Sequence, residues 1–222
     1  MNPKSSELHA IDQFERIASQ SKFAGWPLVG EYELGEEIPF FGKVLHYKLQ
    51  TPTKVENYAS ILRHFGWSVV FGVTTQGKVI TNIQWKPGIN GVEWGLSPGG
   101  IGRVKPGTPL NEITRVTQEF FLKETGYGGG DWIYLDNGMV DSGKFRGAGP
   151  DDHGLPAHMF LAVDLEHQQE PQPLPNEIME KFHVPLSQFP DILRQRPRRF
   201  KEISALTCAY AAIDELREMR RI

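Results

Sequence analysis

The chain has 222 residues, of which 39% are hydrophobic and 11% aromatic, which is typical of a folded globular protein and excludes an intrinsically disordered one. Its formal net charge of −3 provides no strongly basic surface, so we expect no nucleic-acid partner. No apolar run approaches the ~20 residues needed to cross a bilayer, and the N-terminus lacks a signal peptide, so we expect a cytoplasmic protein without a membrane partner.

The first 60 residues have a different character from the remainder of the chain. Residues 7–20 carry apolar side chains near helical spacing, which predicts a short amphipathic helix. The aromatic and β-branched runs that follow are broken by Gly and Pro, which indicates strands and turns. We therefore expect an N-terminal extension over 1–60, serving dimerisation or substrate contact, and a main domain over 61–222.

The main domain begins with two apolar runs within 67–85 that flank a Gly-containing turn, the pattern of a β-hairpin. The near-continuous apolar run from Val69 to Val73 predicts a strand that is buried on both faces. An amphipathic helix is expected over about 110–125, because Thr125-Gly126 is a helix stop signal. Strand-like runs follow at 131–140, 157–166 and 180–186, and a final helix is expected over about 199–221.

Strands and helices follow one another without the regular alternation of parallel βα units. This order predicts an α/β protein with a mixed β-sheet between helices, and not a Rossmann fold. The single cysteine, Cys208, lies in the apolar part of the last helix, where we expect it to be buried and inert. One cysteine also excludes an intramolecular disulfide and a zinc site built on several thiolates.

The stretch WGLSPGGIG, residues 94–102, predicts a Pro-Gly-Gly turn before the predicted helix at 110–125. Gly99 and Gly100 have no side chain and tolerate positive φ, so they permit close approach of a ligand to the backbone. An ordinary turn would have the same composition. We therefore treat both glycines as candidate substrate-binding residues.

The chain has, in order, a hairpin, WGLSPGGIG, an amphipathic helix, KETGYG, DWIYLDNG, HMFLAVDLE and KFHVPLSQF. This order resembles the Nudix hydrolase superfamily, in particular its ADP-ribose and nucleoside-diphosphate-sugar pyrophosphatases. The resemblance covers residues 67 to about 215. It implies a Nudix-like α/β/α sandwich, a homodimer and hydrolysis of a small nucleotide derivative with Mg²⁺ or Mn²⁺. An inactive protein of this fold that binds a nucleotide or a protein partner is the alternative.

The motif that defines this superfamily is altered in the helix. Three helix carboxylates bind the cation in the family, and an ungapped count back from Gly126 places Phe120, Lys123 and Glu124 at their positions. Glu119 then stands at the position of the family's arginine. A lysine ammonium has three donors and no acceptor, so it repels a cation at a ligand position. One acid of three remains.

A second interpretation inserts one residue as a π-type bulge in QEFFLKE, which moves Glu119 to the first carboxylate position. Glu119 and Glu124 would then be the catalytic metal ligands, although on a regular helix they stand ~140° apart. Without the bulge, Phe120 belongs to the core and Glu119 pairs with surface charges.

Four further sites have a functional and an ordinary interpretation. Arg103 could bind a pyrophosphate or be a solvated loop charge. Asp151 and Asp152 could replace lost metal ligands or form an Asp-rich turn. Glu177, in a Pro-rich loop, could be the general base that activates water, or part of a spacer. Trp26 could stack on a nucleobase or pack in a dimer interface.

Overall fold

The structure is a computed structural model of the whole chain. It divides into two compact units, Met1–Ser60 and Ile61–Ile222. The predicted helix over 7–20 lies outside the described residues, which are 28–31, 33–38, 42–51, 53–62, 66–86, 91–101, 104, 107–139, 145–146, 156–172, 179–195, 200 and 202–222.

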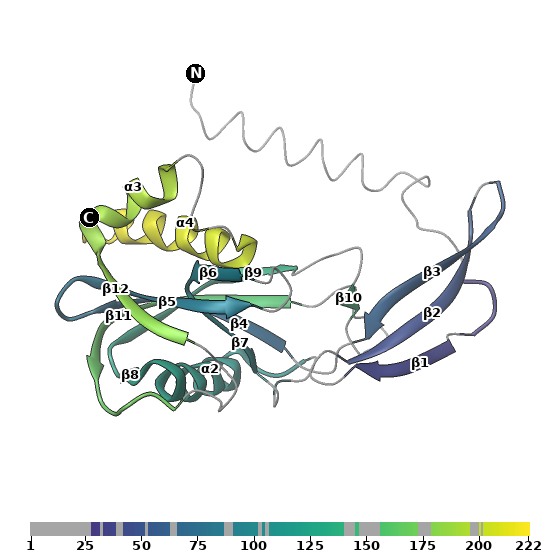
Figure 1. Ribbon diagram of the computed structural model, residues 1–222, viewed down its shortest axis with the longest axis horizontal. Coiled ribbons are helices and arrows are strands. Elements are labelled where there is room, and N and C mark those ends of the chain that lie inside the picture. Colours follow the sequence, from purple (N-terminus) through teal and green to yellow (C-terminus); the bar gives the residue numbers. More distant parts are fainter. Residues whose placement is uncertain are drawn as a thin grey trace, which may run out of the picture. The chain divides into compact units, whose positions relative to one another are not determined.

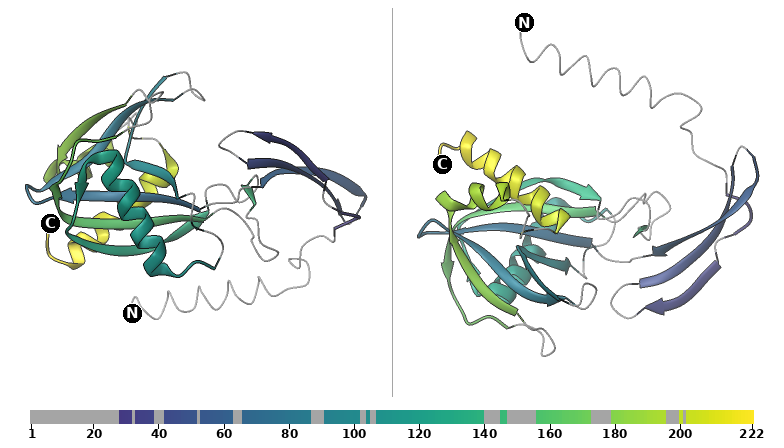
Figure 2. Two further views of the ribbon diagram at one scale, coloured as in Figure 1. Left: turned by 90° about the horizontal axis from the view of Figure 1, so that it is seen from below. Right: turned by 45° about the horizontal axis from the view of Figure 1, so that its top comes forward.

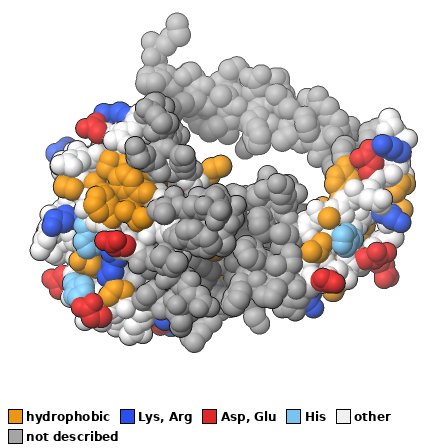
Figure 3. All heavy atoms as spheres, in the orientation of Figure 1, with side chains coloured by type: hydrophobic (Ala, Val, Ile, Leu, Met, Phe, Trp, Pro, Cys, Tyr) orange, Lys and Arg blue, Asp and Glu red, His pale blue; other side chains and the backbone are white. Residues whose placement is uncertain are grey.

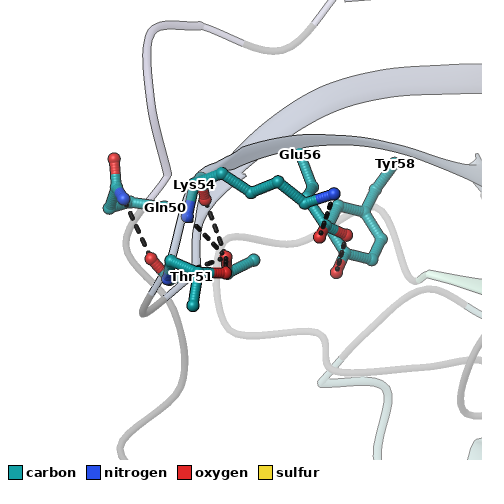
Figure 4. A network of polar contacts seen from close by, with 6 residues as sticks. Gln50, Thr51, Lys54, Glu56 and Tyr58 are labelled. Atoms are coloured by element: carbon teal, nitrogen blue, oxygen red, sulfur yellow. Dashed lines mark hydrogen bonds and ion pairs between the residues drawn. The ribbon is translucent and has the colours of Figure 1, made fainter.

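The N-terminal unit contains strands β1 (Glu33–Ile38) and β2 (Gly42–Gln50), which are antiparallel, and most of β3 (Val55–Leu62), which follows β2 in the sheet. The turn between β2 and β3 is fixed by Thr51, whose Oγ1 donates to the Lys54 carbonyl oxygen at 2.7 Å and accepts from the Lys54 N–H at 3.1 Å (Figure 4). Aromatic and β-branched runs with a polar turn therefore form strands here, as the sequence predicts.

The second unit is built on a mixed sheet with the central order β12-β5-β4-β11-β8. β11 runs parallel to β4 and antiparallel to β9, while β5 pairs antiparallel with β12, β4 and β6. The strands of this sheet are β4 (Gly66–Thr74), β5 (Lys78–Lys86), β6 (Gly91–Gly95), β7 (Ser97–Ile101), β8 (Tyr127–Gly128), β9 (Asp131–Met139), β11 (Pro156–His167) and β12 (Met179–Pro185). The short β10 (Phe145–Arg146) pairs instead with the last two residues of β3.

Helices cover both faces of this sheet (Figure 1; Figure 2). α2 (Leu110–Thr125) lies on one face, and α3 (Phe189–Arg194) and α4 (Ile203–Glu218) lie on the other, with the 3₁₀ helix η3 (Leu186–Gln188) leading into α3. The predicted mixed sheet between helices is confirmed.

The side chains of β4 alternate between two cores, one on each face of the sheet. Val69 and Phe71 join the core under α3 and α4, whereas Val70 joins the core under α2. Both faces of β4 are buried, as the apolar run from Val69 to Val73 predicts.

α2 ends where the sequence predicts. Gly126 adopts the left-handed conformation, with φ of 80°, and its N–H donates to the Leu122 carbonyl oxygen at 2.8 Å. Glycine stabilises a helix end in this way because it has no Cβ to oppose positive φ.

α4 begins at Ile203 and ends at Glu218, so it is shorter than predicted at both ends. The helix begins only at Ile203 because Glu202 caps it: the Glu202 carboxylate accepts hydrogen bonds from the backbone N–H groups of Ser204 and Ala205. Cys208 is fully buried against the sheet, and burial raises the pKa of its thiol to about 12. Among the described helices, none has an apolar stretch of the length needed to span a membrane.

Charged side chains of both signs are mixed over the visible face of each unit (Figure 3). This mixture agrees with the small formal net charge of −3.

Candidate functional site

The Pro-Gly-Gly stretch forms part of strand β7 and not the turn that the sequence predicts. Gly99 lies opposite Ser68, and Gly100 lies opposite Trp67, in an antiparallel ladder with β4. The φ of Gly99 is not positive. Pairing with the central strand therefore overrides the turn preference of Pro-Gly-Gly, and Gly99 is needed for space and not for an unusual backbone conformation.

The space at Gly99 is taken by the side chain of Phe120 from α2. A Cβ built on Gly99 would lie 1.9 Å from both Cε1 and Cζ of the Phe120 ring, far inside van der Waals contact. The half-buried ring thus lies directly on the backbone of β7. Phe120 stands at the first carboxylate position in the ungapped alignment, so an aromatic ring occupies the place from which an acid would face this strand.

The two remaining ligand positions differ from each other. Lys123 is exposed, whereas Glu124 is half-buried. α2 is α-helical from Leu110 to Thr125 without a π turn, so the interpretation with an inserted residue is wrong. On this regular helix Glu124 stands only ~40° from Phe120, and ~140° from Glu119. The structure therefore does not bring Glu119 and Glu124 together.

Glu119 lies on another face of α2, in an ion pair with Arg115. Glu119 Oε1 is 2.5 Å from Arg115 Nη1, and the pair joins residues i and i+4 with both side chains 55% exposed. Such exposed pairs add little stability. Both side chains border a pocket of about 240 Å³ on the α2 face away from β7, lined by Arg115, Gln118, Glu119, Leu122, Gly128, Gly129, Gly130, Trp132 and Gln168.

A lysine that the sequence analysis did not single out lies at the C-terminal end of α2. Lys181 of β12 donates a hydrogen bond to the Thr125 carbonyl oxygen, and its Nζ lies 5.8 Å from the centre of the Tyr127 ring. Partial burial lowers the pKa of Lys181, while Glu170 opposes this shift. An ammonium is favourable at a helix C-terminus because the last carbonyl groups are unpaired and partially negative.

More basic groups lie near Lys181. The pKa of His183 is lowered, first by burial and then by Lys181, Lys78 and His167. The ring of Tyr127 contacts His167 and His183 edge-on, with centroids 5.3 and 5.2 Å away. The alternation Lys-Phe-His in β12 is the sequence signal for this basic group, because alternate residues of a strand lie on the same face and Lys181 and His183 are two positions apart.

The N-terminal unit has a cavity of its own, of about 430 Å³. The rings of Tyr47 and Tyr58 are stacked there, with centroids 5.9 Å apart and planes 20° apart. The cavity is lined by Val29, Gly30, Glu31, Glu33, His46, Tyr47, Lys48, Asn57 and Tyr58.

Comparisons with known proteins support the fold. No family model and no curated protein matches the sequence. Among solved structures, 82 chains match. One of them, described as "Crystal structure of ADP compounds hydrolase", has a TM-score of 0.69 and 16% sequence identity, and the match covers 89% of this chain and 97% of that chain.

The chain has a Nudix-like fold. At 16% identity the similarity establishes the architecture, and the residues of α2 have to be judged on their own chemistry.

Within the part of the chain that the structure describes, no group of three or more His, Cys, Asp or Glu side chains is arranged to hold a metal ion. A hard cation needs several oxygen ligands, and α2 offers Glu124 on the side of Phe120. The other predicted site residues lie outside the described residues, namely Trp26, Arg103, Asp151, Asp152 and Glu177.

Proposed function

We propose that this protein hydrolyses a nucleoside diphosphate derivative of the ADP-ribose or nucleotide-sugar class. The observation that carries this proposal is the extent of the shared fold, which covers 89% of this chain and 97% of the solved ADP compounds hydrolase. The uncovered part of this chain is smaller than the unit Met1–Ser60, so the similarity extends into the N-terminal unit.

The cation in this proposal arrives with the substrate. Magnesium is commonly bound through one or two carboxylates together with substrate phosphates, and not by an all-protein cage. A magnesium or manganese complex of the diphosphate therefore needs fewer protein ligands than a resident metal ion does. We assign Glu124 as its α2 ligand, because Glu124 keeps the family position and lies on the helix side of Phe120.

The remaining roles fall to residues outside the described part of the chain and to the basic end of α2. We assign Asp151 and Asp152 as further ligands, Glu177 as general base, and Arg103 as a pyrophosphate contact. Lys181 at the end of α2 adds positive charge that favours a phosphate-bearing ligand.

The N-terminal unit carries an aromatic surface of its own, for which we propose contact with a nucleobase. The stacked pair Tyr47 and Tyr58 borders the cavity of about 430 Å³, and Trp26 precedes it in the chain. Aromatic rings beside polar side chains suit a nucleobase, which has apolar faces and a polar edge. We further propose that the extension over 1–60 mediates a homodimer.

A second candidate function is binding of the same nucleotide derivative without hydrolysis. Two observations favour it: the Phe120 ring on Gly99 and the exposed ammonium of Lys123 at a ligand position. Phosphoanhydride hydrolysis needs a cation that neutralises the negative charge developing on the departing oxygens, and it needs an activated water. A site that lacks two of the three carboxylates can still bind a nucleotide derivative, but it is poorly equipped to hydrolyse it.

One experiment separates the two functions. ADP-ribose and a panel of nucleotide sugars are tested for phosphomonoester products with Mg²⁺ and with Mn²⁺, and calorimetry measures binding of the same compounds. Cation-dependent turnover that disappears in Glu124→Gln, while binding persists, supports the hydrolase. Binding without turnover establishes the second function, and the absence of both refutes the nucleotide class.

A further inference from the structure

The pocket of about 240 Å³ beside α2, named here the Trp132 pocket, takes no part in the proposed function. Its lining comes from α2, the Gly128–Gly130 segment, Trp132 and Gln168. Its α2 residues centre on Leu122, which stands ~160° from Phe120 around the helix. The pocket is therefore a separate site from the surface of β7 at Gly99.

The wall of the Trp132 pocket depends on three consecutive glycines. A Cβ on Gly128 would lie 2.8 Å from Gln168 Oε1, and one on Gly129 would lie 3.2 Å from Gln168 Nε2. Gly129 and Gly130 have φ of 73° and 64°, and a Cβ on Gly130 would lie 2.0 Å from the Val163 carbonyl oxygen. The segment thus holds a fixed shape that lets the Gln168 amide lie directly against the backbone.

Trp132 is held in place from two sides. Its Nε1–H donates to the Gly129 carbonyl oxygen at 2.9 Å. Its ring meets Phe121 and Phe160 edge-on, with centroids 5.7 and 6.2 Å away. The indole is half-buried, so it is anchored in the core and also borders the pocket. A fixed aromatic ring needs no ordering when a ligand binds, which favours affinity.

The pocket has four polar side chains, and their net charge is zero. Arg115 and Glu119 neutralise each other, and the amides of Gln118 and Gln168 each offer a donor and an acceptor. Such a set favours a neutral ligand that carries many hydroxyl groups. The volume of about 240 Å³ lies below the ~300 Å³ at which pockets for drug-sized ligands begin, so a single ring fits.

We propose that the Trp132 pocket binds a neutral monosaccharide ring. A sugar ring has one apolar C–H face, suited to the indole, and a rim of hydroxyl groups that donate and accept hydrogen bonds. A nucleobase has two apolar faces and gains most between two aromatic or aliphatic walls. This pocket provides one aromatic ring and four polar side chains, which matches the sugar.

The test is a titration of the intact protein with D-glucose, D-galactose, D-mannose and D-ribose, with adenosine as the competing ligand class. The readout is the indole N–H signal of Trp132 in ¹H–¹⁵N spectra, which reports the bond to Gly129 directly. We expect a saturable shift with a millimolar dissociation constant for at least one sugar. Gln118→Ala and Gln168→Ala should each weaken it roughly tenfold, the effect of about one lost hydrogen bond.

Gln76→Ala is the matched control, because Gln76 is an exposed glutamine in the β4–β5 turn and leaves the pocket intact. It should bind the sugar as the parent protein does. The proposal is overturned if no sugar moves the Trp132 signal, if adenosine moves it and sugars do not, or if the pocket variants and Gln76→Ala bind equally. These outcomes do not depend on turnover of a nucleotide, so they stand apart from the test of the proposed hydrolysis.

Discussion

The contact between Gly99 and Phe120 predicts a strong energetic coupling. In Gly99→Ala the new Cβ would lie 1.9 Å from two ring carbons, whereas ordinary contact begins at 3.4 Å, so the ring or the strand has to move by about 1.5 Å. Overpacking of this kind costs about 1–3 kcal/mol. Because the φ of Gly99 is not positive, alanine adopts the same backbone, and the cost comes from the contact itself.

The measurement is a double-mutant cycle by urea denaturation, with Gly99→Ala, Phe120→Ala and the double variant. In the Phe120→Ala background the obstacle is gone, so Gly99→Ala should cost less than about 0.5 kcal/mol. Gly95→Ala is the matched control, since its Cβ would meet nothing closer than Asn82 Oδ1 at 3.9 Å. Equal costs of Gly99→Ala in both backgrounds would refute the packing described here.

Three further predictions concern other parts of the second unit. Cys208, with a pKa of about 12, should not react with a thiol reagent at pH 8 until the protein unfolds, which a time course with and without urea measures. The folded-state pKa of His183 lies below its usual 6.5, so the unfolded state binds more protons as pH falls. The stability of the protein should therefore fall as pH drops through 6.5. The urea midpoints at pH 7.5 and 5.5 should differ less in His183→Asn than in the parent protein. Arg221→Ala removes a half-exposed ion pair with Asp164 at 2.7 Å and should cost about 0–1 kcal/mol in the same assay, so a larger loss would contradict the solvent-screened contact.

The sequence predicts those features of the fold that depend on neighbours along the chain. The end of α2 follows from Thr125-Gly126, because glycine accepts positive φ without strain. The double burial of β4 follows from the run Val69 to Val73, since an apolar run without alternation leaves no face for water.

The contacts at the site join residues far apart in the chain, and local rules do not reach them. Pro-Gly-Gly favours a turn locally, yet Gly99 is a strand residue because β4 supplies hydrogen-bond partners across the sheet. Lys181 reaches the Thr125 carbonyl oxygen from 56 positions away. No periodicity in either segment indicates this bond, which exists because β12 joins the sheet edge beside the end of α2.

The packing of Phe120 connects stability with chemistry at this site. A carboxylate at position 120 would face the backbone of β7 and need water or a cation to satisfy its charge, whereas the aromatic ring excludes both and adds apolar contact. The absence of a Cβ at Gly99, which would admit a ligand in an open site, here admits the ring. The proposed hydrolysis therefore places the reacting phosphate beside Glu124 and the basic end of α2, and not over Gly99.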